Sequence, residues 1–343
     1  MRRICVVAAV AAAALSRPAS AVKITELTIP TAGSHPFGIA TGPDGRVWFC
    51  ESTADKIGAV TIAGTFSEYS TQAGTHPYFI AGVPDKLLAF TSGGANHLGF
   101  MAFSGFEIEV AAGTSPLGIV AGPDGRVWFA TYNDNEIVAF HWLSNSPATA
   151  ANTPSTALSA PWGVAVGPDR WIWFTESNAN RIGVCAPFET SLCNDFPIPT
   201  AGSDPRMITL GPDANLWFTE QTGNKIGRIT SAAVVTEFPV PTPSSQPFGI
   251  AVGPDGNLWF TEFAGNKIGR ITTAGVITEY PVPTANAAPY VICIGPDGRL
   301  WFTEYNAAKI GRVAVFVPGD VDGGGGVAVN DVFYLVNYLF AGG

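Results

Sequence analysis

Apolar and polar positions alternate in short runs along most of the chain, and turn residues separate the runs. β-branched and aromatic residues favour half-buried strands, whereas Gly, Pro, Asn and Asp favour tight turns. The Gly-Pro-Asp-Gly sequence at 253–256 is one such turn. In the part of the chain that starts at Pro247, the pattern predicts four strands, over Phe248–Val252, Asn257–Thr261, Lys267–Thr272 and Val276–Tyr280.

This four-strand unit recurs seven times at steps of 39 to 45 residues, and a second proline follows the opening proline by seven residues in every copy. A repeat of this length, rich in Gly and Trp, is typical of propeller blades. Seven sheets around one axis bury faces that a single sheet leaves open. We therefore expect an all-β, seven-bladed β-propeller of four-stranded blades over residues 22–317. The opening prolines are Pro36, Pro77, Pro116, Pro161, Pro205, Pro247 and Pro289.

The seventh copy lacks a fourth strand, and the N-terminal part of the chain supplies a matching sequence. Residues 24–31 (Ile-Thr-Glu-Leu-Thr-Ile-Pro-Thr) align with residues 277–284 (Ile-Thr-Glu-Tyr-Pro-Val-Pro-Thr). We predict that residues 24–29 form the outer strand of the last blade and close the ring, since an open edge would be left without them.

Composition agrees with one folded domain. The chain has 343 residues, of which 47% are hydrophobic and only 13% charged, and its formal charge is −9. A nucleic-acid partner needs a basic face, and the sequence shows none. We expect the propeller to be monomeric, with an unknown small molecule or an extracellular protein as its partner.

The first 21 residues have the features of a secretory signal peptide. Arg2 and Arg3 precede an apolar run, and Ala19-Ser20-Ala21 fits a cleavage site. The alternative is an uncleaved membrane anchor. With the signal removed, no transmembrane segment is expected, and the protein would be secreted, either extracellular or periplasmic.

Four cysteines remain after the signal peptide. Cys185 and Cys193 flank one hairpin connection and are the best candidates for a disulfide in an oxidising compartment. Cys50 and Cys293 stand in apolar strands, where buried free thiols are usual. They belong to the first and last repeats, which ring closure makes neighbours, so a second disulfide is the alternative.

Two copies have lost part of the repeat. Ala89-Phe90-Thr91-Ser92 replaces the Trp-Phe-Thr-Glu sequence in the second, and the third keeps Trp128 but has Thr131 in place of Glu. The third also carries a long polar connection, about residues 141–160, that indicates a surface loop. We interpret the six tryptophans that remain at this site as core residues, namely Trp48, Trp128, Trp173, Trp217, Trp259 and Trp301.

A glutamate ends the second strand of five copies, and a base follows five residues later. One hypothesis is a ring of catalytic or metal-binding acids. However, both the acid and the base are missing in the second and third copies, which favours a structural ion pair that braces the turn between strands two and three. The pairs are Glu51 with Lys56, Glu176 with Arg181, Glu220 with Lys225, Glu262 with Lys267 and Glu304 with Lys309.

The residue after each opening proline varies between copies and begins the innermost strand, so these side chains should surround one mouth of the central channel. Ligands of propellers usually bind at such a mouth. One Arg among aromatic residues suits a ligand with flat or apolar faces and an anionic group, and the alternative is that the rings only plug the channel. The residues are Phe37, Tyr78, Leu117, Trp162, Arg206, Phe248 and Tyr290.

The repeat, from Pro247-Phe248-Gly249-Ile250-Ala251 through Leu258-Trp259-Phe260-Thr261-Glu262 to Asn266-Lys267-Ile268-Gly269-Arg270, resembles that of the virginiamycin B lyase family over about residues 24–317. The resemblance implies a seven-bladed propeller and magnesium-assisted elimination that linearises streptogramin B antibiotics at their ester bond. It also implies a catalytic His directly after the opening proline in two blades, with an acid before that proline in one of them.

The sequence departs from this pattern, because none of the seven positions after the opening proline is His. Asp204-Pro205-Arg206 keeps the acid but has Arg, which stays protonated and cannot act as a general base. Asp204 and Arg206 are thus weak catalytic candidates. His35 and His76 stand before their prolines, and we expect them to cap loops rather than to catalyse.

The last 26 residues, 318–343, form a separate segment. Counted from Asp320, acids stand at positions one, three and twelve (Asp320, Asp322 and Asp331) with Gly at six, which is calcium-loop spacing. The segment resembles one half of a dockerin repeat. Gly324 replaces the expected ligand at position five, so weak calcium binding is expected, and a flexible Gly-rich linker with a terminal helix is the alternative.

The sequence thus leads to three functional hypotheses. The first is binding of a ligand or partner at the propeller mouth without lyase chemistry. The second is a divergent C–O lyase acting on cyclic depsipeptides of the streptogramin B type, which would require magnesium. The third is an extracellular assembly component held by its dockerin-like tail.

Overall fold

The structure is a computed structural model that describes residues 22–315, except for 84–86, 104–106, 142–149, 153, 155 and 188–192. The expected signal peptide and the dockerin-like tail with its calcium loop lie outside these residues. Across the described part of the chain, no helix has the length and apolarity needed to cross a membrane.

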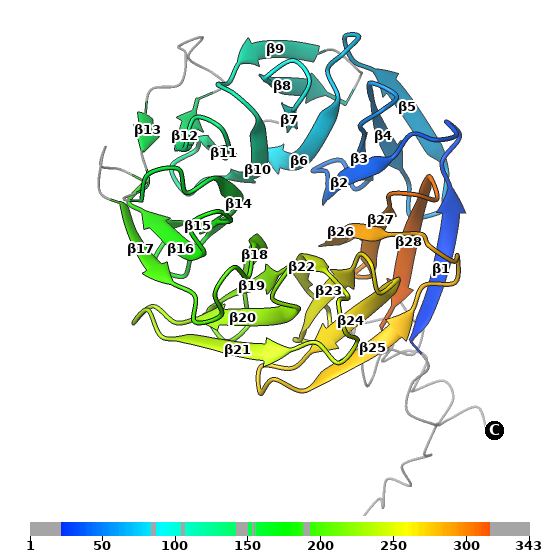
Figure 1. Cartoon of the computed structure of the whole chain (residues 1–343). Coiled ribbons are helices and arrows are strands. Elements are labelled where there is room, and N and C mark those ends of the chain that lie inside the picture. The colour runs from blue at the N-terminus through cyan, green and yellow to red at the C-terminus, as the bar shows by residue number, and fades with distance from the viewer. Residues whose placement is uncertain are drawn as a thin grey trace, which may run out of the picture.

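The described strands form seven four-stranded antiparallel sheets around a central axis (Figure 1), which confirms the predicted fold class. The innermost strands are β2 (Pro36–Thr41), β6 (Pro77–Val83), β10 (Pro116–Ala121), β14 (Pro161–Val166), β18 (Pro205–Leu210), β22 (Pro247–Val252) and β26 (Pro289–Ile294). The second strands are β3 (Val47–Glu51), β7 (Leu87–Ser92), β11 (Val127–Thr131), β15 (Ile172–Glu176), β19 (Leu216–Glu220), β23 (Leu258–Glu262) and β27 (Leu300–Glu304).

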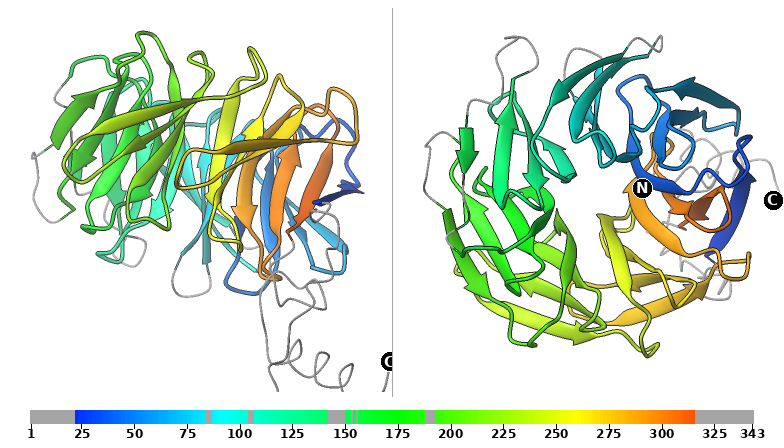
Figure 2. Two further views of the ribbon diagram at one scale, coloured as in Figure 1. Left: turned by 90° about the horizontal axis from the view of Figure 1, so that it is seen from below. Right: turned by 45° about the horizontal axis from the view of Figure 1, so that its top comes forward.

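The two outer strands of each blade complete the sheets, and Figure 2 shows the seven sheets side by side in the ring. The third strands are β4 (Lys56–Val60), β8 (His97–Ala102), β12 (Glu136–Phe140), β16 (Arg181–Cys185), β20 (Lys225–Ile229), β24 (Lys267–Ile271) and β28 (Lys309–Ala314). The outermost strands are β5 (Phe66–Ser70), β9 (Glu107–Ala111), β13 (Ala150–Asn152), β17 (Cys193–Pro197), β21 (Val235–Pro239), β25 (Ile277–Pro281) and β1 (Lys23–Thr28).

The ring closes through the N-terminal strand, as the sequence predicts. β1 pairs antiparallel with β28, from Lys23 opposite Ala314 to Thr28 opposite Lys309, in a sheet of order β1-β28-β27-β26. The last blade therefore combines the first and last described strands of the chain (Figure 1).

Predicted and observed strand bounds in the sixth blade differ by about one residue. The inner strand of this blade also contains a β-bulge: Pro247 pairs with Glu262, and regular pairing resumes only at Ile250 with Phe260. The same irregularity occurs at the start of the inner strand in all seven blades. Bulges re-aim side chains, and here they act on the residues after the opening proline.

The six repeated tryptophans are buried between the blades, each at most 3% exposed. The Asp of the turn after the inner strand accepts a hydrogen bond from the indole N–H, as between Trp259 Nε1 and Asp255 Oδ1 at 3.0 Å. The glycine that opens this turn leaves room for the ring, because a Cβ on Gly253 would lie 2.4 Å from the indole. The recurrent Gly-Pro-Asp sequence thus forms a turn and also accommodates the Trp ring.

The predicted ion pairs between the second-strand glutamates and their bases are wrong. The two residues are neighbours, but the base pairs with a different acid. Glu262 and Lys267 do stand opposite each other at the hairpin end. However, the Lys267 ammonium lies 2.8 Å from Glu279 on the outermost strand and not on Glu262. The reason is burial: the Glu262 carboxyl is enclosed, whereas a lysine amine keeps its charge near water.

The base and the outer-strand acid together hold the preceding blade. Glu279 accepts hydrogen bonds from the backbone N–H and hydroxyl of Thr242, and Lys267 also contacts the Thr242 hydroxyl at 2.5 Å. We call this Thr–acid–base group the interblade clasp. Five clasps occur among the described residues: Thr31–Glu68–Lys56, Thr156–Asp195–Arg181, Thr200–Glu237–Lys225, Thr242–Glu279–Lys267 and Thr284–Glu26–Lys309.

A disulfide joins Cys185 to Cys193, which stand opposite each other on β16 and β17. Cys50 and Cys293 are free. Cys50 packs in the cluster between the first and second blades, whereas Cys293 packs between the last blade and the first. The two thiols therefore lie on opposite sides of the first blade, and the alternative of a second disulfide is wrong.

Candidate functional site

On one face of the propeller, the same backbone conformation and hydrogen bond recur in every blade around the channel. The residue before each opening proline has a left-handed conformation, with φ between 45° and 55° in all seven blades. Its carbonyl accepts a hydrogen bond from the first residue of the turn between the second and third strands, as from Gly93 N to His76 O at 3.1 Å. Non-glycine residues with this φ are uncommon and concentrate at functional sites. This hydrogen bond ties the start of every inner strand to the turn between the second and third strands of the same blade.

Aromatic rings from five blades contact one another in a row at the mouth of the channel. Tyr78 stacks on Phe37 with ring centroids 4.9 Å apart, and Phe37 lies edge-on to Tyr290 at 4.4 Å. Tyr290 stacks on Phe248 at 3.9 Å, and Phe248 contacts Trp162 at 6.3 Å. We call this continuous row of five rings the aromatic plug.

The mouth residues have features of both interpretations, a ligand site and a plug of the channel. Phe248 and Leu117 are buried, at 1% and 5% exposure, and belong to the core below. Phe37, Tyr78, Trp162 and Tyr290 are half-buried and keep part of their rings open to solvent. The partly exposed rings face the mouth, and the buried ring of Phe248 joins them to the core.

Arg206 lies at one edge of the plug, where three neighbouring side chains contact its guanidinium. It stacks over Trp162 at 4.1 Å, and its Nη2 lies 2.7 Å from an Asp204 carboxylate oxygen. Its Nε donates to the Gln221 side-chain oxygen at 2.7 Å. The two weak catalytic candidates therefore neutralise each other, so Arg206 orients the Trp162 ring and is a poor receptor for an anion.

A small pocket of about 110 Å³ adjoins the plug between the third and fourth blades. Tyr132 forms one wall and lies edge-on to Trp162 at 5.6 Å. Asn133 and Asn178 present amides at the rim, and Leu158 is 80% exposed beside them. Its uncharged lining suits a neutral side group of a ligand rather than an ion.

The five second-strand glutamates lie beneath this face and not in the mouth. All are fully buried, and their carboxyl oxygens have no hydrogen-bond partner among the described residues. Burial, together with the nearby charge of Glu237, raises the pKa of Glu220 to about 8. Burial and the charge of Asp195 raise the pKa of Glu176 to about 7. These acids carry a proton through much of the neutral range.

Magnesium, which the resemblance implies, finds no suitable donors at this mouth. Asp204 is bound to Arg206, and Asp55 at the rim accepts hydrogen bonds from two backbone amides. The described residues contain no cluster of three or more His, Cys, Asp or Glu side chains. Magnesium prefers carboxylate oxygens that are free to coordinate, so the residues present do not fit the ion.

The sequence-based prediction missed three aromatic residues of the mouth. Tyr132, Phe263 and Tyr305 each begin the turn between the second and third strands, and their rings contact those of Trp162, Tyr290 and Tyr290 respectively. The signal was present in the sequence, because this position aligns in all seven repeats and varies between them.

Comparison with known proteins agrees with the fold. A family model described as the virginiamycin B lyase family matches residues 7–141 and 102–321. A streptogramin B lyase structure is 32% identical, with 85% of this chain and 97% of that chain covered and a TM-score of 0.79. Virginiamycin B lyase from Staphylococcus aureus is 33% identical, with coverage of 86% and 100% and a TM-score of 0.80. A catalytically inactive histidine-to-alanine variant of that enzyme with quinupristin gives the same values.

Proposed function

Because the chain belongs to the virginiamycin B lyase family, we propose that it binds a cyclic peptide or depsipeptide with apolar side groups on the open side of the aromatic plug. The observation that carries this proposal is the row of five contacting rings, contributed by five separate blades. Such rings offer a large, rigid and amphipathic contact area at low entropic cost.

The mouth favours ring contact over charge recognition. Arg206 is already held by Asp204 and Gln221, so a bound anion would have to displace one of them. The pocket beside Tyr132 has an uncharged lining and would take a neutral side group. Both features favour a ligand that is mostly apolar and uncharged.

Isothermal titration calorimetry with quinupristin tests the proposal. Trp162→Ala removes one end of the plug and the support of Arg206, and should weaken binding at least about 10-fold, as loss of an aromatic anchor usually does. Tyr280→Ala is the matched control, because Tyr280 is a partly exposed ring stacked on Trp259 at the outer edge of a blade. Its affinity should stay within about twofold of the wild type. Absence of binding by the wild type, or equal weakening by both variants, contradicts the proposal.

A divergent C–O lyase is the second candidate, supported by the identity of about one third to streptogramin-cleaving enzymes over nearly their whole length. No histidine follows an opening proline in this chain. This candidate therefore needs another base at the mouth.

A further inference from the structure

The connection into the fourth inner strand carries an apolar residue in a conformation that disfavours it. Three positions before the opening proline, the backbone is left-handed in all seven blades, with φ between 53° and 84°. Four blades have Gly at this position and two have Ser244 and Asn286, whereas the fourth has Leu158 with a φ of 57°. Bulky residues are strained in this region, and such strain concentrates at binding sites. Leu158 is also 80% exposed, so burial in the core does not offset the strain.

Hydrogen bonds hold the backbone around Leu158 from both sides. Asn135, in the turn of the third blade, accepts hydrogen bonds from the Ser159 hydroxyl at 2.8 Å and from the Ala160 N–H at 3.2 Å. The Ser159 carbonyl oxygen accepts a hydrogen bond from the N–H of Asn178, in the turn of the fourth blade, at 3.1 Å. The connection is thus tied to two blades and presents the Leu158 side chain between them.

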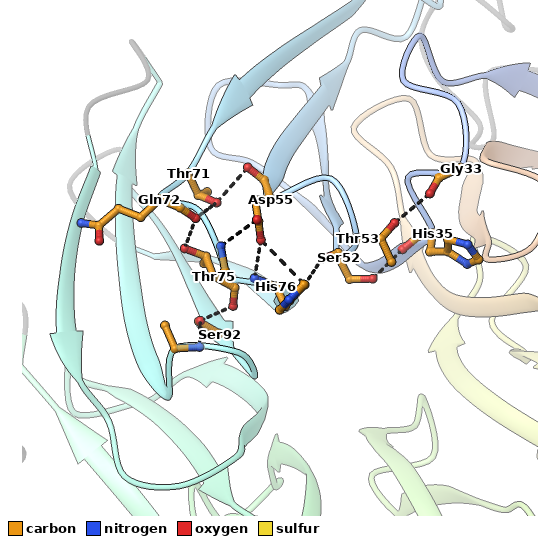
Figure 3. A network of polar contacts seen from close by, with 12 residues as sticks. Gly33, His35, Ser52, Thr53, Asp55, Thr71, Gln72, Thr75, His76 and Ser92 are labelled. Atoms are coloured by element: carbon orange, nitrogen blue, oxygen red, sulfur yellow. Dashed lines mark hydrogen bonds and ion pairs between the residues drawn. The ribbon is translucent and has the colours of Figure 1, made fainter.

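At the equivalent place in the second blade, an imidazole lies between two turns. His76 Nδ1 lies 2.8 Å from the Ser52 carbonyl oxygen and 3.7 Å from Asp55 Oδ1, both in the turn of the first blade (Figure 3). On the other side, a Cβ on Gly94 in the turn of the second blade would lie 2.4 Å from the imidazole ring. The residue before the opening proline therefore decides how much space remains between neighbouring turns at the mouth.

The fourth blade has Ala160 before its opening proline, and the short methyl group leaves this space open. The pocket of about 110 Å³ lies there, and its lining includes the ring of Tyr132 and the side chain of Leu158. Because an apolar cavity of about 150 Å³ holds a benzene ring, the smaller volume suits a branched aliphatic group. Leu158 and Tyr132 offer such a group apolar contact on two sides.

The polar groups at the rim of the pocket match a peptide unit. Asn133 donates from Nδ2 to Ser115 Oγ at 2.7 Å, which leaves its Oδ1 as an acceptor. Asn178 Oδ1 lies 3.5 Å from the Tyr132 hydroxyl, which leaves the Asn178 amide hydrogens as donors. Neither remaining group has a hydrogen-bond partner among the described residues. One acceptor and one donor are complementary to the N–H and C=O of a peptide.

We propose that this pocket is a specificity site for a peptide residue with a branched aliphatic side chain, such as leucine. The side chain enters between Leu158 and the Tyr132 ring, and the peptide groups of the same residue bond to Asn133 and Asn178. This role rests on the proposed binding of a peptide at the aromatic plug, which the edge-on contact of Tyr132 with Trp162 joins to the pocket.

Saturation-transfer NMR on the full chain tests the pocket with one capped residue, N-acetyl-L-leucine methylamide. The wild type should bind it with a Kd of about 1 mM, as expected for so small a ligand. N-acetyl-L-aspartic acid methylamide should bind at least about 10-fold more weakly, because the pocket would desolvate its charge. Ala160→Gln introduces the residue that stands at the equivalent place in the sixth blade, Gln246, with a similar φ. It should fill the pocket and abolish binding.

Leu158→Asn separates a ligand contact from a structural role. Asn286 stands at the equivalent place in the seventh blade, so Asn relieves the strained backbone while removing the apolar contact. Affinity for the capped leucine should fall at least about 5-fold, and the melting temperature should stay unchanged or rise. Val276→Asn is the matched control, because it removes an aliphatic side chain that is 63% exposed in the turn between β24 and β25, away from the mouth. It should leave the affinity unchanged.

Failure of the wild type to bind the capped leucine, or full affinity in Ala160→Gln and Leu158→Asn, overturns the pocket. A lower melting temperature of Leu158→Asn also overturns it, because the leucine would then serve the fold. Calorimetry with quinupristin keeps the two proposals apart. Binding of quinupristin without binding of the capped leucine overturns only the pocket, and the reverse result overturns only binding at the plug.

Discussion

The second and third blades differ from the other five in both construction and surface. The first, fourth, fifth, sixth and seventh blades each have a buried second-strand glutamate and an interblade clasp. The second and third have Ser92 and Thr131 at the glutamate position and His97 and Glu136 at the base position. Loss of the acid and of the base therefore go together, although the two do not form the predicted pair.

The second and third blades carry surface features that the other five blades lack. In the second blade, Gly93 and Gly94 make room for Tyr78 and His76. At the junction of the third and fourth, Tyr132 and Leu158 line the pocket beside the plug. The two altered blades thus add features to the mouth, although four of the five plug rings come from blades that keep the repeat.

The largest expected loss of stability comes from removing β1. The last blade would then have only three strands, whereas the two altered blades keep four. A chain lacking residues 1–29 loses the six paired residues of β1 and the Glu26 contacts with Thr284 and Lys309. An exposed sheet edge also favours aggregation. We expect no cooperative thermal transition in circular dichroism. A chain lacking only residues 1–21 is the control and should unfold cooperatively.

The next largest effect should come from converting the sixth blade to a blade without a clasp. Glu279→Ala removes three hydrogen-bond contacts, to the N–H and hydroxyl of Thr242 and to Lys267. Urea unfolding should show a loss of about 2–4 kcal/mol. Thr278→Ala, at an exposed position on the same strand, should cost less than about 0.5 kcal/mol. Equal losses in the two variants argue against the clasp.

The buried glutamates should make stability fall toward alkaline pH. The folded-state pKa of Glu220 is about 8, against 4.5 as the ordinary value. The folded protein thus binds this proton more tightly, and its contribution to stability is complete below the ordinary pKa and lost as pH rises through about 8. Glu220→Gln stays neutral, so relative to the wild type it should gain about 4 kcal/mol of stability between about pH 5 and about pH 9.

The clasp acids supply the opposite pH dependence. Although burial works to raise the pKa of Glu237, its contacts with Lys225 and Thr200 hold it below the ordinary value. Its contribution is present above the ordinary pKa and lost as pH falls through the lowered one. Glu237→Gln should therefore destabilise the protein most at neutral pH and least in acid. If Glu220→Gln and Glu237→Gln show the same pH trend in thermal melts, their assigned environments are wrong.

Repetition explains which features could be predicted from the sequence. The seven blades, their four strands and the closing strand follow from patterns that recur in register. The base at Lys267 also recurs, but its partner does not follow from spacing, because three acids or hydroxyls lie within reach and burial decides among them. The Asp55–His76 contact joins two residues that depart from the repeat, so only the folded chain reveals it.

The contacts between the rings of the aromatic plug could be predicted only in part. Sequence indicates that Phe37, Tyr78, Trp162, Phe248 and Tyr290 share one mouth, because they occupy one position of the repeat. It does not say whether they contact one another, since that depends on the ring diameter and on side-chain rotamers. The structure shows that they do contact one another and form one continuous row.

A crystal structure of the protein with quinupristin tests the central claim most directly. The predicted result is a ligand resting on the open side of the aromatic plug, with a neutral side group in the pocket beside Tyr132. A ligand bound at the outer rim, on the opposite face, or inside the channel with the rings displaced would contradict it.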